Sequence, residues 1–187
     1  MNKIIVVALF GQSAAGKDTI QNWIVSNIPN TNKIISCTTR PKRDYEENEK
    51  DYFFITEEEF GEKVLDGTML EATVFNNWFY GTTIESLQKN KINIGVFNPA
   101  GIRCLLEDSR LKTIPVWIIS KDKDRLLRSL LREKDPDCDE IVRRFIVDKE
   151  EFSDIDFSYS SIINNQDNID ETLTNIGYIL ENIDQND

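Results

Sequence analysis

Short apolar segments alternate along the chain with stretches in which apolar residues recur every three or four positions. The first apolar segment, residues 4–10, is continuous and rich in β-branched side chains, which is typical of a strand buried on both faces. Apolar residues at helical spacing follow it, up to Pro29. The same reasoning predicts later strands at 33–37, 52–55, 69–75, 92–97 and 114–119, and one that ends at residues 162–163. Strands that alternate with helices predict an α/β fold in three layers, with a central parallel sheet between helices.

Several helix starts are marked by capping residues. Residues 56–59 and 82–85 each have the Thr-x-x-Glu pattern of a capping box, in which side chain and backbone satisfy each other's amides. Pro99 stands at a plausible first helical position. Three more amphipathic or charged stretches are expected to be helices: 122–134, 137–152 and 169–183.

Length and charge narrow the possible functions. The chain has 187 residues, of which 40% are hydrophobic, enough for one compact domain with its own core. A net charge of −11 argues against nucleic acid or an anionic membrane as a partner. The absence of histidine excludes a Ser-His-Asp or Cys-His nucleophile and a His-ligated metal. The longest apolar run, residues 4–10, is too short for a membrane span and lacks a signal-peptide cleavage pattern.

The three cysteines point to a reducing compartment. Cys37, Cys104 and Cys138 are far apart, odd in number and without a Cys-x-x-Cys pair. A zinc ribbon is excluded and a disulfide framework is not expected, so the cytoplasm is the natural location.

The strongest single motif follows the first predicted strand. Residues 11–19 read Gly-Gln-Ser-Ala-Ala-Gly-Lys-Asp-Thr and match the pattern G-x-x-x-x-G-K between a strand and a helix. Backbone amides in such a loop converge on a phosphate, and the lysine completes the positive cradle. The motif predicts a nucleoside triphosphate, with these candidate ligands: Gly11, Ser13, Ala14, Ala15, Gly16, Lys17, Asp18 and Thr19.

Asp18 departs from the usual phosphate loop, in which a Ser or Thr at this position ligates Mg²⁺. Asp18 and the hydroxyl of Thr19 are both oxygen donors, so the two residues form a candidate magnesium site. Alternatively, Asp18 is a favourable anion in the first turn of a helix.

A series of ordered motifs beyond this loop resembles the guanylate kinases. The motifs are Ser36-Cys-Thr-Thr-Arg40-Pro-Lys-Arg43, Glu46, Asn48, Asp51-Tyr52, Met69-Leu-Glu71 and Phe79-Tyr80-Gly81-Thr82. The resemblance extends over nearly the whole chain and implies a P-loop NTPase fold in a single domain, 1–187, that uses ATP and Mg²⁺ to phosphorylate GMP or dGMP. It divides the domain into a core (1–33, 85–124 and 151–187), a nucleoside monophosphate-binding region (34–84) and a helical lid (125–150).

The chemistry of the acceptor residues agrees with that resemblance. Arginines offer bidentate donors to a phosphate dianion and tyrosines offer neutral ones. Glu71 can accept both the N1–H and the N2–H of guanine, and adenine would leave it unpaired. The implied GMP-binding residues are Ser36, Arg40, Arg43, Tyr52, Glu71, Tyr80, Thr82 and Asn98. The two arginines could instead be surface charges, Glu71 a rim residue, and the two tyrosines core aromatics.

The charged helices at 122–152 fit a lid that brings cations to the phosphates. Arg128, Arg132, Arg143 and Arg144 match the family's lid arginines, and Asn164 with Asn165 matches the region near the adenine of ATP. Their alternatives are a solvated helix face and a turn. The resemblance therefore implies ATP contacts from Arg132 and Asn164, and this catalytic set: Lys17, Arg40, Arg128, Arg132 and Arg144.

The pattern breaks after the strand that ends near residue 97. Guanylate kinases usually have Asp-x-Asp there, whereas this chain has Val96 and Asn98. The Asp18 and Asn98 changes resemble ribose 1,5-bisphosphate phosphokinases, and the Gly-Lys-Asp-Thr sequence resembles some viral deoxynucleotide kinases, which favours dGMP as a further acceptor. Guanylate-kinase-like modules that only bind proteins are the alternative of another class. The expected partners are small nucleotides, without nucleic acid or membrane, and the oligomeric state is left open.

Overall fold

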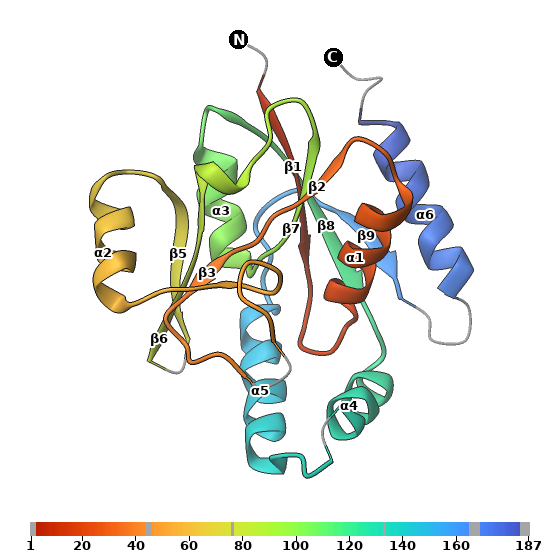
Figure 1. Ribbon diagram of the computed structural model, residues 1–187. Coiled ribbons are helices and arrows are strands. Elements are labelled where there is room, and N and C mark those ends of the chain that lie inside the picture. Colours follow the sequence, from red (N-terminus) through yellow and green to blue (C-terminus); the bar gives the residue numbers. More distant parts are fainter. Residues whose placement is uncertain (1–2, 44–45, 76, 133, 165–168, 184–187) are drawn as a thin grey trace. The chain divides into compact units, whose positions relative to one another are not determined.

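The structure is a computed structural model that describes residues 3–43, 46–75, 77–132, 134–164 and 169–183. The strands are β1 Ile4–Phe10, β2 Thr31–Lys33, β3 Cys37–Thr38, β4 Phe53–Phe54, β5 Met69–Phe75, β6 Trp78–Thr83, β7 Ile92–Val96, β8 Leu111–Ile119 and β9 Ser160–Ile163. The helices are α1 Lys17–Asn27, α2 Glu57–Leu65, α3 Pro99–Glu107, α4 Asp122–Leu131, α5 Cys138–Glu151 and α6 Ile169–Glu181, with a 3-10 turn, η1, at Ile84–Ser86. The chain contains both strands and helices, and helices separate β1 from β2, β4 from β5, β7 from β8 and β8 from β9 (Figure 1).

The strands form two sheets. The first has the order β2-β7-β1-β8-β9, and its β2–β7 and β8–β9 pairs are parallel, as the alternation of strands and helices predicts. The second has the order β4-β3-β6-β5, with β3 and β6 antiparallel and β5 and β6 antiparallel. The register of β5 and β6 places Phe75 opposite Trp78. The α/β class is therefore confirmed, and a small second sheet accompanies the central one.

The chain divides into two compact units, which are described separately. The first, residues 1–8 and 29–114, holds the second sheet with α2 and α3, and both helices contact β5. Its buried apolar side chains include Phe60, Leu70, Ile94, Ile102 and Leu105. The second, residues 9–28 and 115–187, holds α1, α4, α5, β9 and α6. There the fully buried Phe10 stacks on Trp117, with ring centroids 5.5 Å apart, and contacts Phe152, Phe157 and Tyr159.

Local signals explain the starts of α2 and α3. At α2 the hydroxyl of Thr56 accepts a hydrogen bond from the Glu59 amide, and the Glu59 carboxylate accepts one from the Thr56 amide, so this capping box is confirmed. At α3 Pro99 occupies the first turn, as expected, and Asn98 caps it. Both helices begin where a side chain satisfies otherwise unpaired amides.

Two local predictions were wrong. Residues 33–37 do not form one strand, because β2 ends at Lys33 and β3 begins at Cys37, in different sheets. An apolar run alone does not show where a chain passes from one sheet to another. The second Thr-x-x-Glu pattern is not a capping box, because Thr82 lies within β6 and only the short turn η1 follows.

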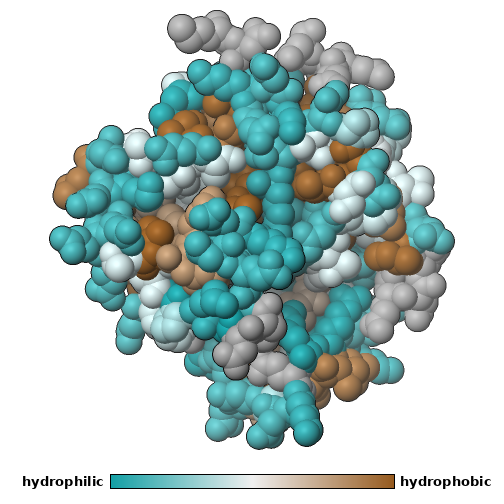
Figure 2. Space-filling view, viewed as in Figure 1, coloured by the Kyte–Doolittle hydropathy of each residue, from teal (hydrophilic) through white to brown (hydrophobic). Residues whose placement is uncertain are grey.

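The face in Figure 2 is mostly hydrophilic, in keeping with the net charge of −11, and its hydrophobic side chains lie in separate patches. One patch is at α4, where Leu126, Leu127 and Leu131 are exposed. In the described part of the chain, no helix has the length and apolar character that a membrane crossing requires.

Candidate active site

The loop between β1 and α1, residues 11–16, has the backbone of an anion-binding loop. Gly16 is in the left-handed conformation, with φ 97° and ψ 17°, directly before α1. A Cβ at Gly16 would lie 2.2 Å from Nδ2 of Asn164, and a Cβ at Gly11 would lie 2.3 Å from the carbonyl oxygen of Ile118. Only glycine fits at these two positions. Because Gly16 has no side chain to cap α1, the amides of the first turn remain suited to a phosphate.

Lys17 is the central cation of this loop. Its Nζ donates hydrogen bonds to the carbonyl oxygens of Gly11, at 2.7 Å, and Gln12, at 3.0 Å. Burial lowers the pKa of Lys17 below its usual value, and the carboxylates of Asp18 and Asp148 only partly oppose this. The ammonium is therefore poorly solvated, which strengthens its attraction to phosphate oxygens.

Two other predicted site residues, Arg128 and Asn164, donate hydrogen bonds to backbone carbonyl oxygens of the loop. The Nη1 of Arg128 donates to the carbonyl oxygen of Ala14 at 3.2 Å and to the hydroxyl of Ser120 at 3.1 Å. The Nδ2 of Asn164 donates to the carbonyl oxygen of Ala15 at 2.7 Å. The structure therefore brings Arg128 and Asn164 to the phosphate loop. Asn165 lies outside the described residues.

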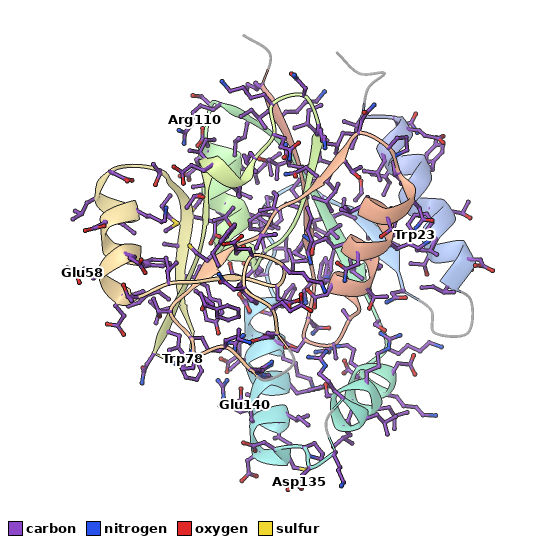
Figure 3. All side chains as sticks on the ribbon, in the orientation of Figure 1. Trp23, Glu58, Trp78, Arg110, Asp135 and Glu140 are labelled. Atoms are coloured by element: carbon purple, nitrogen blue, oxygen red, sulfur yellow. The ribbon has the colours of Figure 1, made fainter. Side chains whose placement is uncertain are left out.

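The other predicted lid arginines are Arg132, at the end of α4, and Arg143 and Arg144, on α5. Arg132 is exposed at the C-terminal end of α4, although its charge adds to burial in lowering the pKa of Lys17. On α5, Arg143 donates to Glu140 at 2.6 and 3.0 Å, and Arg144 donates to Glu140 at 2.7 Å. The hydrogen bonds from Arg143, then Arg144, hold the pKa of Glu140 at about 2. Glu140 lies in the first part of α5 and is labelled in Figure 3.

Two residues that contact the loop were not predicted from the sequence. Arg125 is fully buried on α4 and Asp148 is 6% exposed on α5. Their side chains form an ion pair, and both bond to Ser13. A signal existed for Arg125, because it shares one helix face with Arg128 and Arg132 at spacing i, i+3 and i+7. Nothing in the sequence singles out Asp148.

The predicted base-binding residues Ser36, Glu71 and Thr82, here called the base cluster, lie together in the second sheet. The register of β5 and β6 pairs Glu71 with Thr82, after an irregularity between Met69 and Glu71. The hydroxyls of Ser36 and Thr82 are 2.9 Å apart, and Thr82 also bonds to the Glu71 carboxylate. The base cluster thus combines one carboxylate with two hydroxyls, the donors and acceptors that the guanine edge requires.

Glu71 is the unusual member of the base cluster because the residue is only 9% exposed and neither of the two effects that shift its pKa comes from a cation. Burial raises the pKa of Glu71 to about 7, against a smaller opposite effect of the Thr82 hydrogen bond. A Cβ at Gly101 would lie 3.2 Å from Oε2 of Glu71, so the carboxylate packs against the first turn of α3. Asn98 caps that turn, its Oδ1 accepting from the Gly101 amide at 2.8 Å. A GMP contact for Asn98 stays a prediction.

Three of the four predicted phosphate-binding residues also lie together. The side chain of Arg40 donates to both carboxylate oxygens of Glu46, at 2.7 and 2.9 Å, and its guanidinium carbon is 5.8 Å from the ring centre of Tyr52. The rings of Tyr52 and Tyr80 are 6.0 Å apart and edge to face. Glu46 also accepts from the backbone amide of Arg43 at 2.9 Å, which fixes the loop that carries both arginines. These four predicted residues are here called the phosphate cluster: Arg40, Arg43, Tyr52 and Tyr80.

Asp18 and Thr19 are both exposed in the first turn of α1. Their carboxylate and hydroxyl oxygens suit Mg²⁺, which commonly takes one or two protein oxygens and completes its octahedron with waters and substrate phosphates. In the described ranges, no group of three or more His, Cys, Asp or Glu residues could hold a metal ion. The donor set therefore fits an ion that depends on nucleotide phosphates for most of its ligands.

Comparisons with known proteins agree with this geometry. Residues 1–183 match the family model described as guanylate kinase. The guanylate kinase of Wolbachia pipientis wMel is 35% identical over 182 residues, 94% of this chain and 89% of the relative. That of Wolbachia sp. subsp. Brugia malayi (strain TRS) is 33% identical over 186 residues, 96% of this chain and 93% of the relative.

A solved structure shares the fold. The crystal structure of guanylate kinase from Anaplasma phagocytophilum superposes with a TM-score of 0.69 at 22% identity, over 97% of this chain and 87% of that chain. At this identity the likeness shows the fold alone, a P-loop NTPase fold, while the sequence comparisons show the family. Together with the phosphate loop and the base cluster, they establish that this chain belongs to the guanylate kinase family.

Proposed function

We propose that this protein transfers the γ-phosphoryl group of ATP to GMP or dGMP, giving ADP and the guanosine diphosphate. The observation that carries the proposal is Glu71, a buried carboxylate that bonds to Thr82 in a chain that also has a phosphate loop. A buried acid without a cation nearby is costly unless a ligand supplies the donors. Guanine supplies two, N1–H and N2–H.

The donor nucleotide binds to the second unit. The loop amides and Lys17 hold the β and γ phosphates, and Arg128 and Asn164 support the loop from its outer side. We assign residues 125–150 to a lid from which Arg132 and Arg144 reach the transferred phosphoryl group. Arg144 then exchanges its bond to Glu140 for one to a phosphate.

The acceptor nucleotide binds to the first unit, in residues 34–84. The base cluster takes guanine, with Asn98 near it, and the phosphate cluster takes the acceptor phosphate. Arg40 keeps Glu46 as its partner and is held there in a fixed orientation, which suits bidentate binding of phosphate oxygens.

The chemistry requires no general base, because the attacking oxygen of the acceptor phosphate is already anionic. That oxygen forms a bond to the γ phosphorus while the bond from phosphorus to the β–γ bridging oxygen breaks, and ADP leaves with that electron pair. Catalysis consists of aligning the two nucleotides and offsetting the charge on the phosphoryl group. Lys17, Arg40, Arg128, Arg132 and Arg144 supply the positive charge.

Asp18 and Thr19 are the proposed magnesium ligands, and their oxygens would hold the ion beside the phosphate loop. Bound there, Mg²⁺ neutralises charge on the β and γ phosphates. Because the usual acids are replaced by Val96 and Asn98, Asp18 is the carboxylate available for this role.

The Asp18→Ala variant tests this assignment. We expect the Mg²⁺ concentration for half-maximal activity to rise about tenfold, since one charged ligand is worth on the order of 1–2 kcal/mol. The measurement is a magnesium titration of initial rates at saturating ATP and GMP, with Asp124→Ala, a half-buried acid in the first turn of α4, as the matched control. An unchanged magnesium requirement would mean that Asp18 only stabilises the first turn of α1.

A coupled assay for ADP tests the whole proposal. GMP, dGMP, AMP, UMP and ribose 1,5-bisphosphate are offered separately with ATP and Mg²⁺. GMP or dGMP should be turned over at least 10³-fold more efficiently than AMP or UMP, because a site built on hydrogen bonds rejects analogues that leave its groups unpaired. Activity with ribose 1,5-bisphosphate and none with GMP would assign the chain to that alternative reaction. If no ADP forms with any of these acceptors, the result would favour a protein-binding module.

The net charge and the cysteines bear on the partners and the cellular location that we propose. Small nucleotides are the proposed partners, because a net charge of −11 opposes binding to nucleic acid or anionic lipid. Cys37, Cys104 and Cys138 are free thiols, which suits a reducing cytoplasm.

A further inference from the structure

All three polar groups of Ser13, in the phosphate loop, are held by one ion pair. Its backbone amide donates to Oδ2 of Asp148 at 2.8 Å, and its hydroxyl donates to Oδ1 of Asp148 at 3.2 Å. Its carbonyl oxygen accepts from Nε of Arg125 at 2.9 Å. The guanidinium of Arg125 also bonds directly to Asp148, so the two side chains and Ser13 form a closed ring of hydrogen bonds.

The Arg125–Asp148 pair is buried and its geometry is fixed. Arg125 is fully buried and Asp148 is 6% exposed. The Nη1 of Arg125 donates to Oε1 of Gln12 at 2.9 Å and to Oδ1 of Asp122 at 2.7 Å, and the guanidinium lies 4.4 Å from the ring centre of Phe145. A guanidinium with partners on all three nitrogens, held away from water, has one orientation.

The pair continues a row of contacts along the outer side of the loop. The carbonyl oxygens of residues 13, 14 and 15 are bonded in turn by Arg125, Arg128 and Asn164. In a trans peptide the carbonyl oxygen and the following amide point in opposite directions. Holding these three carbonyls therefore fixes the orientation of the following amides, at residues 14–16, of which the Ala15 amide donates to the carbonyl oxygen of Gln12 at 3.2 Å.

We propose that Arg125 and Asp148 are positioning residues, which hold the phosphate loop in the conformation that accepts the phosphates of ATP and fasten it to α4 and α5. The inference rests on the proposed function, in which this loop binds ATP. Neither side chain needs to touch the nucleotide, because both act through the backbone of Ser13. Their effect should fall on ATP and spare GMP, whose binding residues lie in the other unit.

A purely structural ion pair is the alternative, and replacing both partners separates the two roles. A single replacement leaves a buried unpaired charge and can unfold the protein, whereas replacing both by apolar residues of similar volume commonly keeps or increases stability. The variants are therefore Arg125→Met with Asp148→Leu, and Asp148→Asn alone, which keeps the shape of the side chain. The matched control is Asp124→Asn, which removes an acidic charge from the first turn of the same helix, α4.

For both test variants we expect the KM for ATP to rise about 10- to 100-fold, since small misplacements of a binding group have effects of this size. The KM for GMP should stay within about twofold, and the control should match the wild type for both substrates. Thermal unfolding of the double variant at or above the wild-type temperature would show that the ATP defect is not a loss of folding.

A folded double variant with wild-type KM for ATP and wild-type kcat would overturn the inference and leave a structural pair. Direct calorimetric titration with ADP accompanies the kinetics. If the wild type binds ADP but phosphorylates no acceptor, the proposed function fails. In that case, weaker binding of ADP by the two variants would still support the positioning role of Arg125 and Asp148. If the wild type binds ADP and the double variant binds it equally well, the inference fails whatever the activity.

Discussion

Replacing Glu71 with Gln should lower kcat/KM for GMP by about 10³-fold while leaving the low activity with AMP unchanged. The carboxylate accepts two hydrogen bonds from guanine, and hydrogen bonds to charged groups contribute about 1.5–3 kcal/mol each. A glutamine amide keeps one acceptor but points its own donor at a guanine donor. Kinetics with GMP and AMP as competing acceptors measure the ratio directly.

The control for this variant is Glu85→Gln in the same unit. Glu85 is an exposed acid 3.4 Å from Lys63, so its replacement should change neither kcat/KM nor the GMP to AMP ratio by more than about twofold. If the Glu71→Gln variant prefers GMP over AMP as strongly as the wild type does, another group recognises the base. The account of the base cluster would then be wrong.

The raised pKa of Glu71 adds a pH dependence to the same experiment. Burial raises this pKa to about 7, and only the ionised carboxylate accepts both guanine donors. Below pH 7, kcat/KM for GMP should therefore fall about tenfold for each pH unit. The acceptor phosphate also titrates, with a second pKa near 6. The difference between the wild type and the Glu71→Gln variant isolates the contribution of Glu71.

The same carboxylate should reduce stability as pH rises. Between pH 4.5 and 7 the folded protein binds a proton at Glu71 that the unfolded chain has released, so the free energy of unfolding falls through this interval. The total is on the order of 3 kcal/mol, since one pKa unit corresponds to about 1.4 kcal/mol. Urea unfolding of the Glu71→Gln variant should give a smaller loss between pH 5 and pH 8. Base recognition at this position thus conflicts with stability.

Sequence signals were sufficient where one local pattern determines the structure. The continuous apolar run at residues 4–10 predicts β1 to the residue, because the glycine that follows ends the strand. Thr56 with Glu59 predicts the start of α2 because both hydrogen bonds of a capping box are local. Ser36, Glu71 and Thr82 were predicted to act together only through a family resemblance, since strand register is what places them in one cluster.

Sequence signals failed where a contact joins distant segments. Asp148 lies on a charged helix, and charged residues on helices are usually solvated, so its burial against Ser13 has no local sign. The spacing of Arg125 with Arg128 and Arg132 indicates a shared helix face, but not that Arg125 is buried against Ser13. The pattern Thr82 to Glu85 imitates a capping box, but the Thr82 hydroxyl is bonded to Ser36 in a sheet. Long-range pairing overrides a short helical signal in that case.

Replacing Lys17 with Met should lower kcat by about 10³-fold or more. Methionine has nearly the length of lysine but no charge, and removal of one donor aimed at developing charge commonly costs 10²–10³-fold, with charged groups at a phosphoryl group at the upper end. The KM for GMP should stay within about twofold, because the base and phosphate clusters belong to the other unit. Steady-state kinetics and calorimetric titration with GMP measure these two effects.

The stability of this variant should change little, because two effects oppose each other. Loss of the Nζ removes hydrogen bonds to the carbonyl oxygens of Gly11 and Gln12, which is unfavourable, but it also removes a poorly solvated charge whose pKa burial already lowers. Lys123→Met, at an exposed position on α4, is the matched control and should retain wild-type kcat. A Lys17→Met variant that melts like the wild type, binds GMP and keeps more than about a tenth of its kcat would contradict phosphoryl transfer at this loop. Failure of both transfer and GMP binding would instead indicate a general loss of structure, which the melting curve would reveal.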